Sequence, residues 1–235
     1  MKQETYESMT KLAASPLNVR KRVAVTLRVK IGLGLLVLGV GLAGCGSAKV
    51  SRHYQLTVPG NIVPAAEANP VPVTLLIGRL AAPALYHEDQ IVYSSGGQSM
   101  GTYEYQRWSE PPTDMIAEVM LRQLRASGHY RGVYVLRSDL SGDYLLHGHL
   151  YDFKEISGPP LVGRVTMELE LRNVKTGNTV WTHFYTRDEP AAGKEVGAVV
   201  AALDKNVQQG IAEFRASLDQ YFAEHPPGQP ARTEP

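Results

Sequence analysis

The sequence of 235 residues contains a single cysteine, Cys45, so an intrachain disulfide framework is excluded. Long hydrophobic runs are also missing, because the apolar run at residues 31–42 has twelve residues and a membrane-spanning helix needs roughly 20. An excess of charge of one sign is absent as well, since 24 basic residues face 23 acidic ones and the net charge is +1. Composition is otherwise that of an ordinary globular protein, with 43% hydrophobic residues.

The near-neutral total conceals a strong asymmetry along the chain. Residues 1–44 carry a net charge of +5, and the remaining residues carry −4. A mildly acidic body has no broad basic face for phosphate groups. We therefore expect no nucleic-acid partner, and we assign the positive charge to a targeting segment.

The N-terminal segment has the pattern of a bacterial lipoprotein signal peptide. Basic residues between positions 21 and 30 precede the apolar run at 31–42, whose length suits a signal-peptide core. Leu42, Ala43, Gly44 and Cys45 follow directly and resemble a lipobox. This pattern predicts cleavage between Gly44 and Cys45 and lipidation of the Cys45 thiol. The alternative is an uncleaved membrane anchor with an incidental thiol.

Cleavage would leave a mature protein of 191 residues, held by acyl chains. Gly46 follows the cysteine in place of the Asp that resembles an inner-membrane retention signal, which favours the outer membrane, on the periplasmic side, in a Gram-negative bacterium. The predicted organisation is a signal peptide, a lipidated N-terminus with a first strand and a Pro-rich connector, one domain, and a disordered Pro-rich tail. The respective ranges are 1–44, 45–70, 71–225 and 226–235.

The body is predicted to be a single α+β domain. The cleanest signal is at residues 164–174, where apolar and polar residues alternate strictly, as in a strand with one buried face. Helical spacing of apolar residues predicts one helix that begins at Pro111 and Pro112 and ends at Gly128, and a long C-terminal helix at 193–222. Strands are predicted at 53–58, 71–80, 90–94, 98–107, 133–136, 143–156, 164–174 and 179–186. This order predicts a mixed, mainly antiparallel sheet covered by two helices.

Candidate catalytic and metal-binding residues are few. His147 and His149 share one face of a predicted strand, but Asp152 falls on the opposite face by parity, so a polar-face histidine pair is favoured over a metal site. Glu168 and Glu170 lie on the solvated face of the alternating strand, which explains them without general acid–base chemistry. We therefore predict no catalytic residue, metal or cofactor, and no enzymatic activity.

Aromatic residues concentrate between positions 86 and 108, within and beside a predicted hairpin. Tyrosine and tryptophan are enriched where proteins meet partners. Tyr93, Tyr103, Tyr105 and Trp108 are therefore the candidate partner-binding residues. The alternative, that half of these aromatic residues fill the core, has equal weight because they also favour strands.

Several segments together resemble the family of ABC-type transport auxiliary lipoproteins. The similarity begins at Cys45 and the nearby strand at 54–56, continues through 77–83 and 90–93, and is most specific at residues 107–112, which lead into the first helix. It ends with the strands at 145–153 and 165–174 and the C-terminal helix. The resemblance implies a non-enzymatic outer-membrane lipoprotein that works with an MCE-domain protein, a permease and an ATPase. Such a system moves phospholipid or other lipids between the two membranes.

Two other functions stay open at this level. One is an outer-membrane assembly lipoprotein, or one that regulates peptidoglycan synthesis or secretion, with a similar small α/β architecture. The other is a lipid-anchored hydrolase. The sequence also leaves open whether the domain forms a homo-oligomer and whether it binds lipid itself, because fold alone does not fix function.

Overall fold

The computed structural model of the protein describes residues 49–58, 69–96, 98–137 and 139–227. The predicted signal peptide, the cleavage site at Gly44 and Cys45, most of the Pro-rich connector and most of the predicted tail lie outside these residues. The chain divides after Lys49, and the unit that starts at Val50 contains every element described below.

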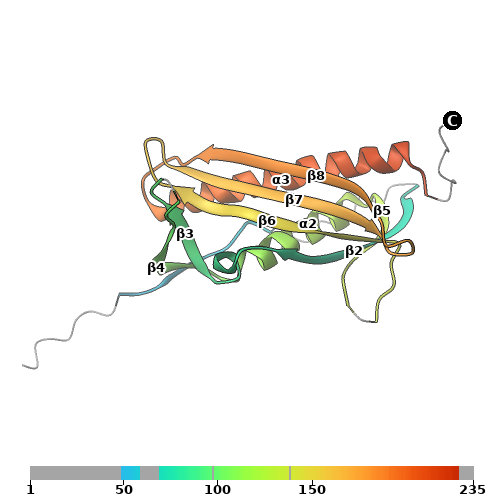
Figure 1. The fold of residues 1–235 in the computed structure, drawn as a ribbon, viewed down its shortest axis with the longest axis horizontal. Helices are drawn as coiled ribbons and strands as arrows, with labels where there is room; N and C mark the ends of the chain where they lie inside the picture. The colour runs from blue at the N-terminus through green and yellow to red at the C-terminus, as the bar shows by residue number, and fades with distance from the viewer. Residues whose placement is uncertain (1–48, 59–68, 97, 138, 228–235) are drawn as a thin grey trace, which may run out of the picture. The chain divides into compact units, whose positions relative to one another are not determined.

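Eight strands and two α-helices make up the described part of this unit (Figure 1). The order of strands, hairpin, helix, strand, three-stranded meander and helix confirms the predicted α+β class. The elements are β1 (Arg52–Tyr54), β2 (Val71–Ala81), the short 3-10 helix η1 (Ala84–Tyr86), β3 (Gln90–Ser94), β4 (Gly101–Trp108), α2 (Pro112–Ser127), β5 (Tyr130–Val135), β6 (Tyr144–Ile156), β7 (Val162–Asn173), β8 (Thr179–Pro190) and α3 (Val196–Glu224).

All eight strands belong to one mixed sheet. Strands β6, β7 and β8 form a long antiparallel meander, and β3 and β4 form a hairpin. On its other edge β6 pairs in parallel first with β2 and then with β3. Parallel pairs of β2 with β5 and of β1 with β4 complete the sheet. The mixed sheet predicted from the sequence is therefore confirmed.

Some strand ends differ from the sequence prediction because pairing overrides local composition. β8 extends past the predicted end at residue 186 to Pro190, since its pairing with β7 continues to the Val162–Pro190 pair. β5 starts at Tyr130, three residues before the predicted start, where it joins β2. β1 ends at Tyr54, and the chain beyond it leaves the sheet.

A β-bulge in the middle of β6 reverses which residues face the core. Leu150 lies opposite Met167, and Asp152 lies opposite the next residue, Thr166, so Tyr151 is an extra residue in the strand. Buried side chains therefore switch from Leu150 to Phe153. The parity argument that placed Asp152 on the face opposite the histidines is wrong, because the bulge returns it to the same face.

Both helices cover the same face of the sheet and leave the other face open (Figure 1). Helix α2 begins with Pro112 in its first turn and ends at Gly128, whose positive φ of 65° forms a left-handed C-cap. This confirms the predicted ends of the helix. Helix α3 lays an apolar stripe on β6, β7 and β8. No helix in the described ranges is long and apolar enough to cross a membrane.

A buried polar contact fixes α3 to the sheet. The Asn206 side chain is 0% exposed and donates hydrogen bonds to the carbonyl oxygens of Gly163 (3.0 Å) and Arg187 (2.8 Å). The Tyr185 hydroxyl donates to Asn206 Oδ1 at 2.6 Å. Close packing surrounds this contact, because a Cβ atom at Gly210 would stand 2.6 Å from the Met167 methyl carbon. The long helix is thus positioned by specific hydrogen bonds as well as by apolar burial.

Substitution of Asn206 is expected to destabilise the domain strongly. Asn206→Ala leaves the buried carbonyl oxygens of Gly163 and Arg187 without this side-chain donor and removes one of the two acceptors of the Tyr185 hydroxyl, which lowers the free energy of unfolding by about 3 kcal/mol. Gln209→Ala on the outer side of the same helix is the matched control and stays within about 0.5 kcal/mol of the parent. Urea unfolding followed by circular dichroism measures both values, and equal losses for the two variants would contradict the role of Asn206.

The same contact predicts how stability falls at alkaline pH. Burial, followed by the nearby charge of Glu213, raises the pKa of Tyr185 from 10.0 to about 12. The neutral phenol is therefore favoured in the folded state, so its contribution is complete below pH 10 and is lost as the pH rises towards 12. Urea unfolding at several pH values from 9 to 12 will show a shallower decline for Tyr185→Phe than for the parent. Identical slopes would show that Tyr185 does not contribute.

Candidate functional site

The aromatic cluster predicted to bind partners is divided between the core and the surface. Trp108 is 1% exposed and packs against Phe153 with a ring-centroid distance of 5.2 Å. Tyr86 is equally buried. The expectation that Trp108 presents its ring to a partner is wrong, because the end of β4 is covered on the helix side. These two residues fill the core instead, as the alternative interpretation of the cluster expects for part of it.

Tyr93, Tyr103 and Tyr105 are half-buried. The rings of Tyr93 and Tyr103 lie 5.0 Å apart, and the Tyr103 hydroxyl donates a hydrogen bond of 2.8 Å to the buried carboxylate of Glu155. Burial, and then this hydrogen bond, raise the pKa of Tyr103 above its ordinary value. The Ser157 hydroxyl donates to the same carboxylate at 2.6 Å. These contacts fix the hairpin against β6 and leave ring edges at its surface.

The two candidate histidines lie on the open face, directly opposite two glutamates. In the β6–β7 register His147 faces Glu170 and His149 faces Glu168. His147 Nε2 and Glu170 Oε2 are 4.0 Å apart, whereas the His149 ring stacks on Tyr151 at 4.3 Å. Within the described ranges, no group of three or more His, Cys, Asp and Glu side chains is arranged to hold a metal ion. The bulge brings Asp152 to the same face without completing such a group.

An exposed group of aromatic and acidic side chains occupies the centre of the open face. Phe184 is 56% exposed and Tyr151 is 41% exposed, and their rings lie 6.3 Å apart. The Tyr151 hydroxyl donates a 2.9 Å hydrogen bond to Glu168, which raises the pKa of Tyr151. Sequence reasoning did not select Tyr151 or Phe184. We refer below to the open-face patch, which consists of His149, Tyr151, Glu168, Glu170 and Phe184.

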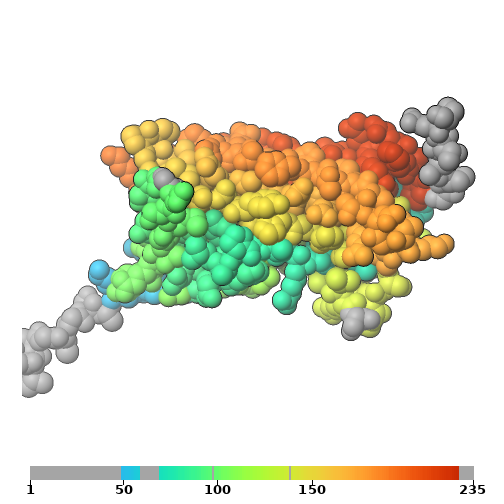
Figure 2. All heavy atoms as spheres, in the orientation of Figure 1, coloured from blue at the N-terminus to red at the C-terminus, as the bar shows by residue number. Residues whose placement is uncertain are grey.

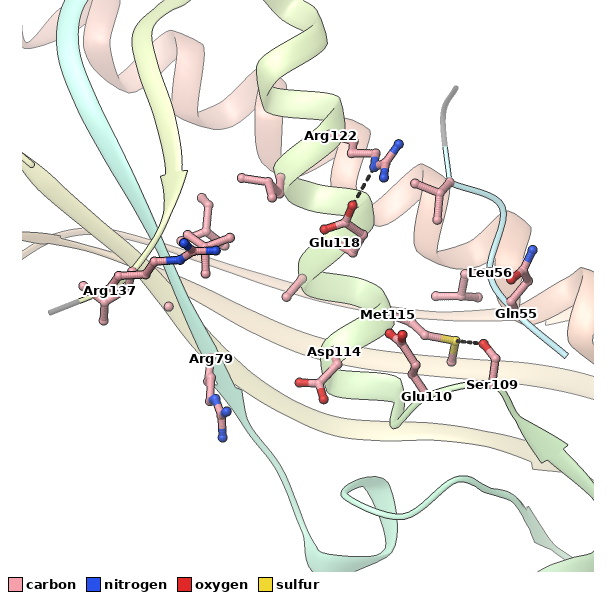
Figure 3. Close-up of a pocket in the computed structure, with 17 residues that line it drawn as sticks. Gln55, Leu56, Arg79, Ser109, Glu110, Asp114, Met115, Glu118, Arg122 and Arg137 are labelled. Carbon is pink, nitrogen blue, oxygen red and sulfur yellow. Dashed lines mark hydrogen bonds and ion pairs between the residues drawn. The ribbon is translucent and has the colours of Figure 1, made fainter. Parts of the chain in front are cut away.

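The helix-covered side carries a groove of about 840 Å³ beside α2. Figure 3 shows Arg79 and Arg137 on one side of the helix and Leu56 on the other. Buried apolar side chains such as Ile77 and Met115 form its floor. The groove combines an apolar floor with charged side chains at its rim, a combination suited to contact with an amphipathic surface.

The polar groups at this groove do not form a nucleophilic centre. The Ser109 hydroxyl contacts the Met115 sulfur at 4.0 Å, and no histidine of the described ranges lines the groove. Glu118 pairs with Arg122 along the helix surface at 2.5 Å (Figure 3). A nucleophile needs a base within hydrogen-bond reach, and among the described residues the Ser109 hydroxyl has the Met115 sulfur and no carboxylate as its side-chain partner.

The fold and its surfaces define a small α+β domain with one helix-covered face, one open sheet face and exposed features arranged for contact. The chain belongs to the family of ABC-type transport auxiliary lipoprotein components, whose model matches residues 54–213. This match confirms the resemblance seen in the sequence. Among curated proteins, no sequence matches the chain.

Solved structures show the same fold at low sequence identity. A crystal structure of a DUF330 protein from Xanthomonas campestris is 19% identical, with a TM-score of 0.65, and the match covers 74% of this chain and 98% of that one. An uncharacterised protein is 14% identical, with a TM-score of 0.57, and the match covers 72% and 99% of the two chains. These similarities extend over nearly the whole length of both relatives, so the described unit corresponds to their complete fold.

The division of the aromatic cluster predicts different effects for two substitutions. Trp108→Ala opens a cavity in the core and lowers the free energy of unfolding by about 3–5 kcal/mol. Tyr105→Ala, at a half-buried position in the same strand, costs about 1 kcal/mol. Urea unfolding distinguishes the two, and a Trp108→Ala variant as stable as the parent would contradict the core position of the indole ring.

Proposed function

We propose that the protein is a non-enzymatic outer-membrane lipoprotein that serves as the auxiliary component of an ABC/MCE-type transporter. The system would move phospholipid or other lipids between the inner and outer membranes. The observation that carries this proposal is the family match over residues 54–213, which begins nine residues after the lipobox cysteine, Cys45. The partners are an MCE-domain protein, a permease and an ATPase.

The proposed anchor is a lipid-modified Cys45 at the start of the mature chain, after removal of residues 1–44. Fewer than ten residues separate Cys45 from β1, and an extended chain gains at most about 3.5 Å per residue. The start of β1 would therefore lie within about 25 Å of the membrane surface. The range 71–225 would then form the body of the domain, with residues 226–235 as a terminal tail.

In this proposal the domain contributes binding and leaves ATP hydrolysis to the ATPase. Tyr93, Tyr103 and Tyr105 on the hairpin remain candidate contact residues, since their rings are partly exposed and those of Tyr93 and Tyr103 are held by their contacts with each other and with Glu155. Rigid aromatic residues suit an interface because little conformational entropy is lost when they are covered. Trp108 supports this hairpin from the core.

Affinity purification from native membranes after crosslinking in cells tests the proposal. The full chain is expected to recover an MCE-domain protein together with its permease and ATPase, identified by mass spectrometry. Cys45→Ala is the matched control, because it removes the lipidation site and leaves residues 50–227 unchanged. We expect this variant to be lost from the outer-membrane fraction and to recover the partners at least tenfold less.

Recovery of peptidoglycan-synthesis or secretion components in place of the transporter would overturn the proposed function. It would favour instead the assembly or regulatory lipoprotein considered from the sequence. Recovery of the same transporter proteins by the Cys45→Ala variant in equal amount would contradict the anchoring part alone.

A further inference from the structure

The open face of β6, β7 and β8 faces the viewer in Figure 2, where no helix lies over the yellow and orange strands. Its side chains alternate with those that pack beneath α3, so the exposed set is fixed by the strand register. Thr182, Phe184 and Thr186 of β8 lie opposite Glu170, Glu168 and Thr166 of β7. The open-face patch therefore consists of neighbours on three adjacent strands.

The aromatic part of the patch is a row of three rings. His149 stacks on Tyr151 with an interplanar angle of 28°, and Tyr151 lies next to Phe184. Phe184 is more exposed than Tyr134 or Tyr151, although a phenylalanine has no polar atom that benefits from water. An aromatic face presents negative potential to solvent and attracts cations within about 6 Å of the ring centre.

The acidic part of the patch lacks a Lys or Arg partner. Within the described residues, no lysine or arginine lies within 4.0 Å of Glu168 or Glu170, which contact Tyr151, Thr179 and His147 instead. Two other carboxylates of this face, those of Asp188 and Asp152, form ion pairs with basic side chains.

Asp188 receives two hydrogen bonds of 2.7 Å from Arg164, and Asp152 pairs with Lys154 at 2.5 Å. The negative charge that remains available is thus concentrated beside the exposed rings.

We propose that the open-face patch binds an arginine-containing segment of a partner protein, with a guanidinium group stacked on Phe184 or Tyr151 and paired with Glu168 or Glu170. Arginine matches both halves of the patch, because its planar group stacks on aromatic rings and bonds to carboxylates in a bidentate geometry. The strand register holds the rings and the carboxylates side by side before the partner arrives.

The shape and charge of the face favour a protein over other occupants. The rings lie side by side on the sheet, and no cavity of the described residues is lined by both Tyr151 and Phe184, as it would be to enclose a small ammonium ligand. A second copy of the chain, related by a two-fold axis that passes through the patch, would bring Glu168 and Glu170 close to the same residues of its mate, and like charges in contact are unfavourable. This inference goes beyond the proposed function, because it holds for any partner that presents an arginine.

Site-specific photocrosslinking in cells tests the inference with the full chain. A photoreactive amino acid replaces Thr182, which is exposed beside the patch, and in a parallel strain it replaces Ala216, which is exposed on α3. We expect a protein adduct at position 182, and we expect its crosslinked peptide to contain an arginine. Phe184→Ala or the pair Glu168→Gln and Glu170→Gln reduces this adduct by about tenfold.

Asp188→Asn is the matched control on the same face, because its carboxylate is already bound to Arg164, and it leaves the adduct unchanged. No adduct, an adduct to lipid or to a second copy, a crosslinked peptide without arginine, or a yield insensitive to the patch variants would overturn the inference. An arginine-bearing partner unrelated to any transporter would support the inference while contradicting the proposed function. Circular dichroism of the purified variants confirms that each one folds.

Discussion

The pairing of strand β6 on both of its edges is the constraint on which the rest of the sheet depends. It pairs with β7 along its length and, on its other edge, with β2 and then β3, so it joins the meander to the remainder of the sheet. Gly148 allows this close pairing, because a Cβ atom there would stand 2.0 Å from the Glu168 carbonyl oxygen. The bulge at Tyr151 shifts the alternation of side chains by one residue. It thereby determines which side chains after Leu150 point to the core and which point to the open face.

The two faces of the sheet have different physical roles. The helix side is fixed by apolar burial and by Asn206, which joins α3 to the backbone of both β7 and β8. The open side contributes few core residues, and its charged pairs, Arg164 with Asp188 and Lys154 with Asp152, are only partly buried and add little to stability. It can therefore carry exposed rings and carboxylates without loss of fold. A protein whose family role is auxiliary to a transporter has, on this face, a surface that folding leaves free for contact.

Much of the fold could be predicted from the sequence because its signals are local. The strict alternation in β7 and the helical spacing in α2 and α3 gave the correct elements and the correct class. The position of Asp152 could not be predicted, since a bulge depends on pairing with β7 and leaves no local pattern. Trp108 was misassigned because its burial depends on contact with Phe153, which is distant in sequence. Phe184 and Tyr151 are 33 residues apart in the sequence, so no cluster of aromatic residues along the chain indicates them; only the strand register brings them together.

Hydroxyl-radical footprinting of the protein, purified alone and within its membrane assembly, tests most directly the claim that it acts through its open face. Exposed aromatic side chains are oxidised, and a bound partner protects them. The account predicts strong protection of Phe184 and Tyr151 in the assembly and unchanged oxidation of exposed Leu140, which lies after β5 and outside the α2 groove. Protection of Leu140, with Phe184 and Tyr151 oxidised as in the free protein, would contradict it.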